Sequence, residues 1–319
     1  MQAEQRQVAR GDISLSLQVA GSGPLVLMVH GFPELSHSWR HQMEPIASAG
    51  FTAAALDVRG YGASSKPAGI EAYAIDELAD DIAAVIDELG GGSAILIGHD
   101  WGAPQVYAAA LRHPEKVRGV VGLSVPAMEQ ADIKPSDMRA AVFADRFFYQ
   151  TYFQEPGVAE RELEADVRRF LKLFYVHLSA DRTPGTQVLV QEEAIDLLSY
   201  LPNVEALPEW LTEEDLETYT AAFRAGGLTG PLNRYRAQDL DFERMQPYAG
   251  QKITAPGLFV GGALDPVRDI IPGLDLYADP TPRFADPRGA HIIEDAGHWV
   301  QQEAPEEVNA FILRFLKAL

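Results

Sequence analysis

The feature that most constrains the fold of this chain is the pentapeptide Gly-His-Asp-Trp-Gly at residues 98–102, which directly follows the apolar run of residues 94–97. A glycine at each end lets the backbone turn sharply from a strand into a helix, and such an elbow exposes its middle side chain above a sheet. That middle residue is Asp100. A carboxylate oxygen suits displacement at a saturated carbon, which leaves an alkyl ester that water must then hydrolyse. We therefore expect Asp100 to be a nucleophile rather than only a turn former.

Hydrolysis of such an ester needs a base and a residue that orients it. His298 lies on a predicted loop after a short apolar segment, and we expect it to be the base that activates water. Asp265 follows the strand-like residues 257–261 and is the predicted orienting carboxylate, although Asp265-Pro266 is also a common turn sequence. The order Asp100, Asp265, His298 matches the order of nucleophile, acid and histidine in hydrolases with such an elbow.

The ester carbonyl becomes an oxyanion when water attacks it, so two backbone N–H groups should face it. Trp101, the residue after the nucleophile, is predicted to supply one of them. Phe32 is predicted to supply the other, from the His-Gly-Phe-Pro segment at residues 30–33 that follows the strand-like run of residues 25–29. The predicted oxyanion hole therefore combines two segments that are far apart in the sequence.

These motifs resemble the α/β-hydrolase superfamily, and specifically the soluble epoxide hydrolases. Segments 149–157 and 230–236 resemble the lid segments that give this family its paired tyrosines, and the resemblance assigns those acids to Tyr149 and Tyr235. It implies hydrolysis of an epoxide to a vicinal diol through a covalent ester on Asp100. Some relatives carry the orienting acid soon after an earlier strand, which makes Glu129 the alternative to Asp265.

Two other classes of protein share this fold. Haloalkane dehalogenases have the same elbow and would use Asp100 with Trp101 as one halide donor. The second halide donor of those enzymes is often an asparagine after the His-Gly pair or a tryptophan of the lid, and Phe32 occupies the former position. A small-molecule receptor on the same fold is the alternative that is not an enzyme, and it is disfavoured because every catalytic part is present.

The chain departs from the family pattern at two places. The Leu-Ser-His sequence at residues 35–37 replaces aromatic residues of many bacterial relatives, which predicts a wider or wetter pocket wall. Arg234 replaces an aromatic residue beside Tyr235. Successive helical residues point about 100° apart, so its guanidinium either faces solvent or turns inward, where it would favour the phenolate and weaken Tyr235 as an acid.

Composition narrows the class of partner. The 319 residues, 47% of them hydrophobic, can fill a sizeable core, and the formal net charge of -20 argues against nucleic-acid binding. The chain has no cysteine, so it has neither a disulfide nor a thiol nucleophile. Residues 1–7 are polar and no stretch is apolar enough to span a bilayer, which predicts a cytoplasmic location and no membrane partner. The expected partners are a small neutral epoxide and water, without metal or cofactor, and a homodimer is compatible with the sequence.

Short apolar runs alternate with amphipathic stretches, which predicts an α/β fold with a mostly parallel central sheet flanked by helices. Residues 75–89 and the stretch from Pro305 onward each have one apolar face and are predicted helices. From residue 127 to residue 245 no strand is obvious, and charged runs and aromatic residues dominate. The expected architecture is an α/β-hydrolase core domain of residues 1–126 and 246–319 with an inserted helical lid of residues 127–245.

Overall fold

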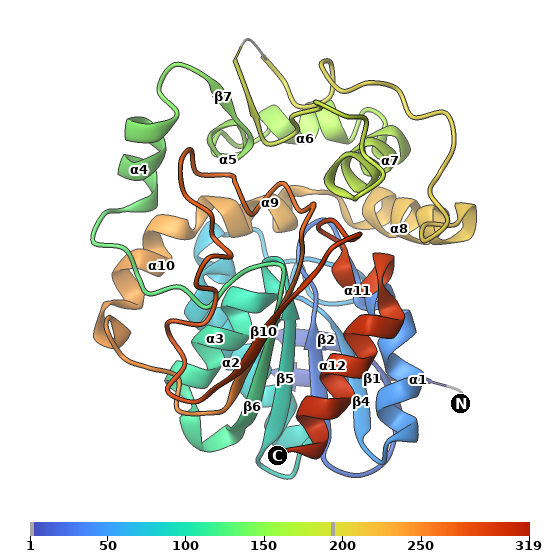
Figure 1. The fold of residues 1–319 in the computed structure, drawn as a ribbon, viewed down its shortest axis with the longest axis vertical. Helices are drawn as coiled ribbons and strands as arrows, with labels where there is room; N and C mark the ends of the chain where they lie inside the picture. Colours follow the sequence, from blue (N-terminus) through green and yellow to red (C-terminus); the bar gives the residue numbers. More distant parts are fainter. Residues whose placement is uncertain (1–2, 193–194) are drawn as a thin grey trace.

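The computed structural model describes residues 3–192 and 195–319, and an eight-stranded sheet lies at its centre (Figure 1). The strand order is β1-β2-β4-β3-β5-β6-β9-β10. β2 pairs antiparallel with β1 and β4, and the remaining neighbours are parallel. The strands are β1 Glu4–Arg10, β2 Ile13–Gly21, β3 Leu25–Val29, β4 Thr52–Asp57, β5 Ala94–His99, β6 Val117–Leu123, β9 Gly257–Gly262 and β10 Pro287–Ile293.

The central strands are buried on both faces. Every residue of β3, β5 and β9 is buried. A parallel strand that is covered on both sides has a continuous apolar sequence, which explains the apolar runs that mark these strands. Successive side chains of β3 pack on opposite faces of the sheet. Leu27 and Val29 face one layer of helices, and Val26 and Met28 face the other.

Helices cover both faces of the sheet. α2 (Ile75–Leu89) and α3 (Gly102–Arg112) pack on the face of Leu27, and α2 has the predicted bounds. The other face is covered by α1 (Arg40–Ser48), α11 (Val300–Glu303) and α12 (Pro305–Lys317). The mostly parallel sheet flanked by helices is therefore confirmed. No helix in the described part of the chain is both long and apolar enough to cross a membrane.

Residues 127–245 are here called the cap, and most of its described part lies beyond the carboxyl ends of the parallel strands (Figure 1). The sequence showed no strand in the cap, but β7 (Phe147–Phe148) pairs antiparallel with β8 (Val190–Gln191). Strands of two residues are too short to produce a sequence period. The cap helices are α4 Pro135–Val142, α5 Tyr149–Tyr152, α6 Val158–Leu163, α7 Val167–Leu178, α8 Glu213–Gly226, α9 Thr229–Arg236 and α10 Gln238–Arg244.

The last cap helix, α10, lies beside the core rather than above it. Arg244 pairs with Asp76 of α2 at 3.1 Å, and the Asp241 carboxylate accepts a hydrogen bond from the Ile75 N–H at 2.7 Å. Because Ile75 is the first residue of α2, Asp241 satisfies one of the free N–H groups at that helix end. The cap is thereby anchored to α2 just after the segment that carries Tyr235.

Candidate active site

The turn from β5 to α3 is a tight elbow with Asp100 at its tip. Asp100 has a φ of 49°, a left-handed conformation that is strained for a residue with a side chain. The two glycines make this turn possible: a Cβ at Gly98 would lie 2.4 Å from the carbonyl oxygen of Gly102, and a Cβ at Gly102 would lie 2.0 Å from that of Val29. The side chain of Asp100 is thus presented between the carboxyl end of β5 and the amino end of α3.

The Asp100 carboxylate faces the end of the neighbouring strand β3. Its Oδ1 accepts a hydrogen bond from the Phe32 N–H at 2.8 Å. Only glycine fits at position 31, because a Cβ on Gly31 would lie 2.3 Å from that oxygen. Trp101 is the N-cap residue of α3, at the end of the helix where backbone N–H groups are free. The structure therefore brings both predicted oxyanion-hole segments to Asp100.

His298, on the loop after β10, lies between two carboxylates. Its Nδ1 lies 3.0 and 3.1 Å from the oxygens of Asp265, and its Nε2 lies 3.5 Å from Oδ2 of Asp100. Burial opposes the charge on the imidazole, but both carboxylates outweigh burial and raise the pKa of His298 well above its usual value. The two carboxylates therefore favour the protonated form of the buried imidazole.

Asp265 is fixed by groups that sequence reasoning missed. Its Oδ2 accepts a hydrogen bond from the Tyr277 hydroxyl at 2.6 Å, and its Oδ1 accepts one from the Val267 N–H at 2.8 Å. Tyr277 lies in the irregular segment between β9 and β10, where no pattern marks it. The alternative acid, Glu129, is exposed and pairs with Lys252 at 2.6 Å. The structure therefore places Asp265, and not Glu129, against the imidazole.

Tyr149 of α5 and Tyr235 of α9 are brought together by the cap. Their ring centroids are 5.7 Å apart at an interplanar angle of 79°, and both side chains are buried. Burial is the main cause that raises the pKa of each phenol, and the nearby charge of Asp100 raises both further. Phe32 and Phe153 pack against the Tyr235 ring, with centroids 5.3 and 5.0 Å away. The two phenols thus pack beside Phe32, whose backbone N–H bonds the Asp100 carboxylate.

Arg234 turns inward, which is one of the two orientations that the sequence left open. Its guanidinium lies over the Trp101 ring, 4.9 Å from the centroid, donates a hydrogen bond to the Tyr73 carbonyl and pairs with Asp241. Burial lowers the pKa of Arg234 to about 9. The pKa of Tyr235 is still raised, so the arginine does not convert this phenol to a phenolate.

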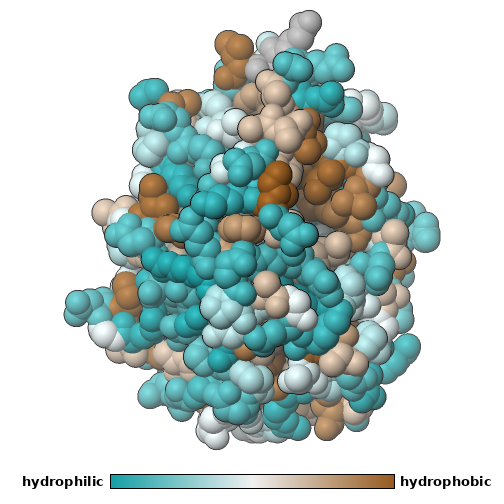
Figure 2. All heavy atoms as spheres, turned by 90° about the vertical axis from the view of Figure 1, so that its left-hand side faces the viewer, coloured by the Kyte–Doolittle hydropathy of each residue, from teal (hydrophilic) through white to brown (hydrophobic). Residues whose placement is uncertain are grey.

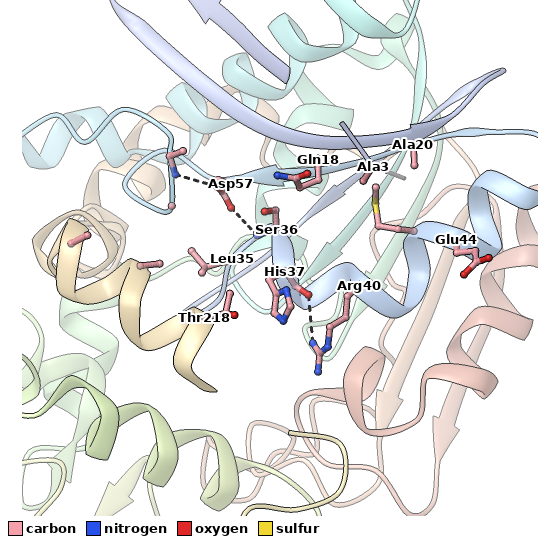
Figure 3. Close-up of a pocket in the computed structure, with 15 residues that line it drawn as sticks. Ala3, Gln18, Ala20, Leu35, Ser36, His37, Arg40, Glu44, Asp57 and Thr218 are labelled. Atoms are coloured by element: carbon pink, nitrogen blue, oxygen red, sulfur yellow. Dashed lines mark hydrogen bonds between the residues drawn. The ribbon is translucent and has the colours of Figure 1, made fainter. Parts of the chain in front are cut away.

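Residues 35–37 line a cavity of about 680 Å³ between the core and α8 (Figure 3). Among the described residues that line it, none is one of the seven predicted site residues. The Ser36 N–H donates to Asp57 at 2.8 Å, and His37 Nε2 lies 2.7 Å from an Asp215 oxygen. These residues therefore lie at a cavity that the seven site residues do not line. Their effect on the catalytic pocket stays a prediction.

The strand order and the turn at Asp100 together define the class of protein: this is an α/β hydrolase whose elbow carries a carboxylate in place of a hydroxyl. Within the described residues, no group of three or more His, Cys, Asp or Glu side chains is arranged to hold a metal ion.

Comparison with known proteins identifies the family. The family model described as alpha/beta hydrolase fold matches residues 24–305. Epoxide hydrolase A of Mycobacterium tuberculosis is 39% identical over 325 residues, which cover 99% of this chain and 98% of that protein. The crystal structure of epoxide hydrolase A from Mycobacterium thermoresistibile has a TM-score of 0.92 and 43% identity, and the match covers 99% of this chain and 98% of that one. The mouse bifunctional epoxide hydrolase 2 is 38% identical over 306 residues, which cover 96% of this chain but 54% of that protein. The chain belongs to the epoxide hydrolase family.

Proposed function

We propose that this protein hydrolyses a small neutral epoxide to a vicinal diol through a covalent alkyl ester on Asp100. The observation that carries the proposal is that two buried phenols, Tyr149 and Tyr235, pack together beside the nucleophile. The Tyr235 ring contacts Trp101, which follows Asp100, and Phe32, whose N–H bonds the Asp100 carboxylate. Opening an epoxide places negative charge on its oxygen while a nucleophile attacks carbon, so the site needs both a nucleophile and proton donors. These three side chains meet that need.

In the proposed first step, Asp100 attacks an epoxide carbon while Tyr149 and Tyr235 donate hydrogen bonds to the epoxide oxygen. The phenols can do so because their raised pKa values keep them protonated. A positioned proton donor typically accelerates such a step by about 10² to 10⁴-fold. The carbon–oxygen bond of the ring breaks, and its oxygen takes a proton from one of the phenols to become the first hydroxyl of the product. That phenol is reprotonated by the proton that His298 gives up before the second step.

In the proposed second step, His298 activates the water that attacks the ester carbonyl of Asp100. While Asp100 is ionised, its charge helps to keep His298 protonated. Esterification removes that charge, so the pKa of His298 falls and the neutral imidazole becomes available as a base. The N–H groups of Phe32 and Trp101 then stabilise the oxyanion. Its collapse expels the alkoxide of the product, which takes the proton of the newly added hydroxyl, so that the diol leaves, the carboxylate is restored and His298 keeps the other proton of the water.

A dehalogenase would need a second halide donor beside Trp101, and the other tryptophans are not available for that role. Trp299 donates its indole N–H to the Tyr175 carbonyl at 2.8 Å, and Trp210 donates to Asp181 at 3.2 Å. Trp39 lies in the core on the far face of the sheet. Trp101 therefore has no second indole beside it in the described residues to complete a halide site.

We also propose that residues 127–245 form a lid domain over a core of residues 1–126 and 246–319, because Tyr149, Phe153 and Tyr235 all come from this segment.

The net charge of -20 supports the proposal that nucleic acid is not a partner. Figure 2 shows one face of the protein that is largely hydrophilic, with hydrophobic residues gathered toward its upper part at the level of the cap. A cytoplasmic location and a homodimeric assembly remain proposals that rest on the sequence.

The proposal is tested by an activity screen of the purified protein with styrene-type epoxides, fatty-acid epoxides and haloalkanes. We expect vicinal diols from at least one epoxide class, and no diol from the Asp100→Asn variant. Halide release from haloalkanes with no diol from any epoxide would favour the dehalogenase instead. Binding without turnover of either class would favour the receptor.

A further inference from the structure

Glu303, at the end of α11, directs its carboxylate back onto the loop that carries His298. Oε2 accepts a hydrogen bond from the Gly297 N–H at 2.8 Å, and Oε1 accepts one from the Trp299 N–H at 2.8 Å. One carboxylate therefore holds the backbone on both sides of His298. If Glu303 only capped helix α11, it would bond the Trp299 N–H alone, because Trp299 is the N-cap residue of that helix.

The same carboxylate also binds the cap. Oε2 accepts a second hydrogen bond, from the Ala180 N–H just after α7, at 2.8 Å. The two segments are in close contact at this point, since a Cβ on Gly297 would lie 2.5 Å from the Ala180 nitrogen. In Figure 1, α11 lies at the top of the core, directly beneath the cap. Glu303 thus joins the His298 loop to the segment that follows a cap helix.

The backbone groups of His298 itself are also bonded. Its N–H donates to the Leu178 carbonyl at 3.0 Å, and its carbonyl accepts hydrogen bonds from Ser124 Oγ at 2.7 Å and His99 Nε2 at 2.8 Å. These bonds fix the position of the residue, whereas the bonds from Glu303 fix the direction of the chain on either side. The direction of the chain determines where the imidazole Nε2 points.

The Glu303 carboxylate has no cationic partner in the described part of the chain, and the groups that donate hydrogen bonds to it are three backbone N–H groups. Burial is the largest influence on it and, with the charge of Asp265, raises the pKa of Glu303 to about 7 despite those three bonds. A half-buried carboxylate without a cation beside it is costly, and a merely structural contact could be made by a neutral side chain.

We propose that Glu303 is a positioning residue for the hydrolytic half-reaction. Its carboxylate holds the loop of His298 against the cap, so that the imidazole faces the Asp100 ester. This inference rests on the proposed function. Glu303 touches neither substrate nor reacting atoms, and it acts through the backbone of residues 297–299. Formation of the ester needs Asp100 and the two tyrosines, and it should not depend on Glu303.

The test compares the two half-reactions in the Glu303→Gln variant. The amide keeps the shape but turns one acceptor into a donor that opposes a backbone N–H. Rapid mixing with excess substrate, followed by intact-protein mass measurement, gives the rate of ester formation, and the decay of the adduct gives the rate of hydrolysis. We expect hydrolysis to slow by about tenfold, as loss of a hydrogen bond to a charged group implies, with ester formation within about twofold of the wild type.

Two further variants make the result decisive. Glu307→Gln removes an exposed carboxylate of α12 and should leave both steps unchanged. Glu303→Asp keeps the charge on a side chain that is one methylene shorter, and it should slow hydrolysis by less than Glu303→Gln does. If the glutamine variant does not fold, the aspartate variant is compared with the wild type in its place. Equal rates of hydrolysis in wild type and both Glu303 variants, or equal slowing of both half-reactions, would overturn the proposal. Absence of any adduct even in a His298→Gln variant would instead contradict the proposed function itself.

Discussion

At the scale of single residues, the proposed chemistry depends on how the charges of two carboxylates affect the pKa of His298. His298 lies between Asp265 and Asp100, and both carboxylates raise its pKa. Only one of these charges persists in the proposed intermediate, because Asp100 becomes a neutral ester. The same imidazole is thus stabilised as a cation before the first step and is released as a base for the second.

A neutral side chain at position 100 should reproduce this change without substrate. In the Asp100→Asn variant we expect the pKa of His298 to be lower than in the wild type, since the charge of Asp100 is one of the causes that raise it. An NMR titration of the His298 ring protons measures both values. An unchanged or higher pKa in the variant would show that Asp265 alone controls the imidazole.

Removal of the base should separate the two half-reactions. If His298 serves only hydrolysis, His298→Gln should still be alkylated at Asp100 and should accumulate the ester. Intact-protein mass measurement would then show an adduct of substrate mass, located on the peptide that contains Asp100. A variant that forms no adduct under saturating substrate would place His298 in the first step.

At the scale of elements, the core could be predicted from the sequence and much of the cap could not. The apolar runs of β3 and β5 and the amphipathic helix α2 have strong periods or strong burial, so their positions follow from local pattern. The strands β7 and β8 have two residues each, and no local pattern marks them. The direction of Arg234 was also open, because a helical period gives the spacing of side chains but not the partners, Tyr73 and Asp241, that bury this one.

The candidate site divides in the same way. Asp100, Asp265 and His298 were found from their positions relative to strands. Tyr149 and Tyr235 required the resemblance to a family, because each lies among many other aromatic residues. Tyr277 and Glu303 were missed, since Tyr277 lies in an irregular loop and Glu303 has the sequence context of any acidic residue near a helix end.

The two cap helices that carry the tyrosines should act together in ring opening. We expect Tyr149→Phe and Tyr235→Phe to slow ester formation singly, and the double variant to lose about 10² to 10⁴-fold, the usual contribution of a positioned acid. Rapid-quench measurement of adduct formation checks this, with Tyr152→Phe as a control in which α5 loses a phenol that bonds Glu162 instead. Ester formation near the wild-type rate in the double variant would refute the assignment.

At the scale of the whole molecule, buried polar groups join the core, the elbow and the cap. Glu34 lies fully buried behind the elbow, where it accepts hydrogen bonds from the Gly31 N–H at 2.9 Å and Gln301 at 3.0 Å and lies 2.7 Å from His99 Nδ1. His99 in turn bonds the His298 carbonyl. The nucleophile loop and the base loop therefore share one buried carboxylate.

This carboxylate should make folding stability sensitive to acid. Burial would raise the pKa of Glu34, but the charge and hydrogen bond of His99 outweigh it and lower that pKa from 4.5 to about 2. Its contribution is then present above pH 4.5 and is lost as the pH falls toward 2. We expect Glu34→Gln to be less stable than the wild type at pH 7 and to lose less stability between pH 4.5 and the acid limit, as measured by urea unfolding. A parallel loss in both proteins would contradict this role.

The central claim is that Asp100 forms a covalent ester, and the fate of oxygen in a single turnover tests it most directly. With enzyme in excess over epoxide in ¹⁸O-labelled water, the proposed mechanism delivers a carboxylate oxygen of Asp100 to the product, because water attacks the ester carbonyl. Mass spectrometry should then find largely unlabelled diol and a labelled peptide that contains Asp100. Fully labelled diol and an unlabelled peptide would show that water attacks the epoxide directly, and would contradict the covalent mechanism.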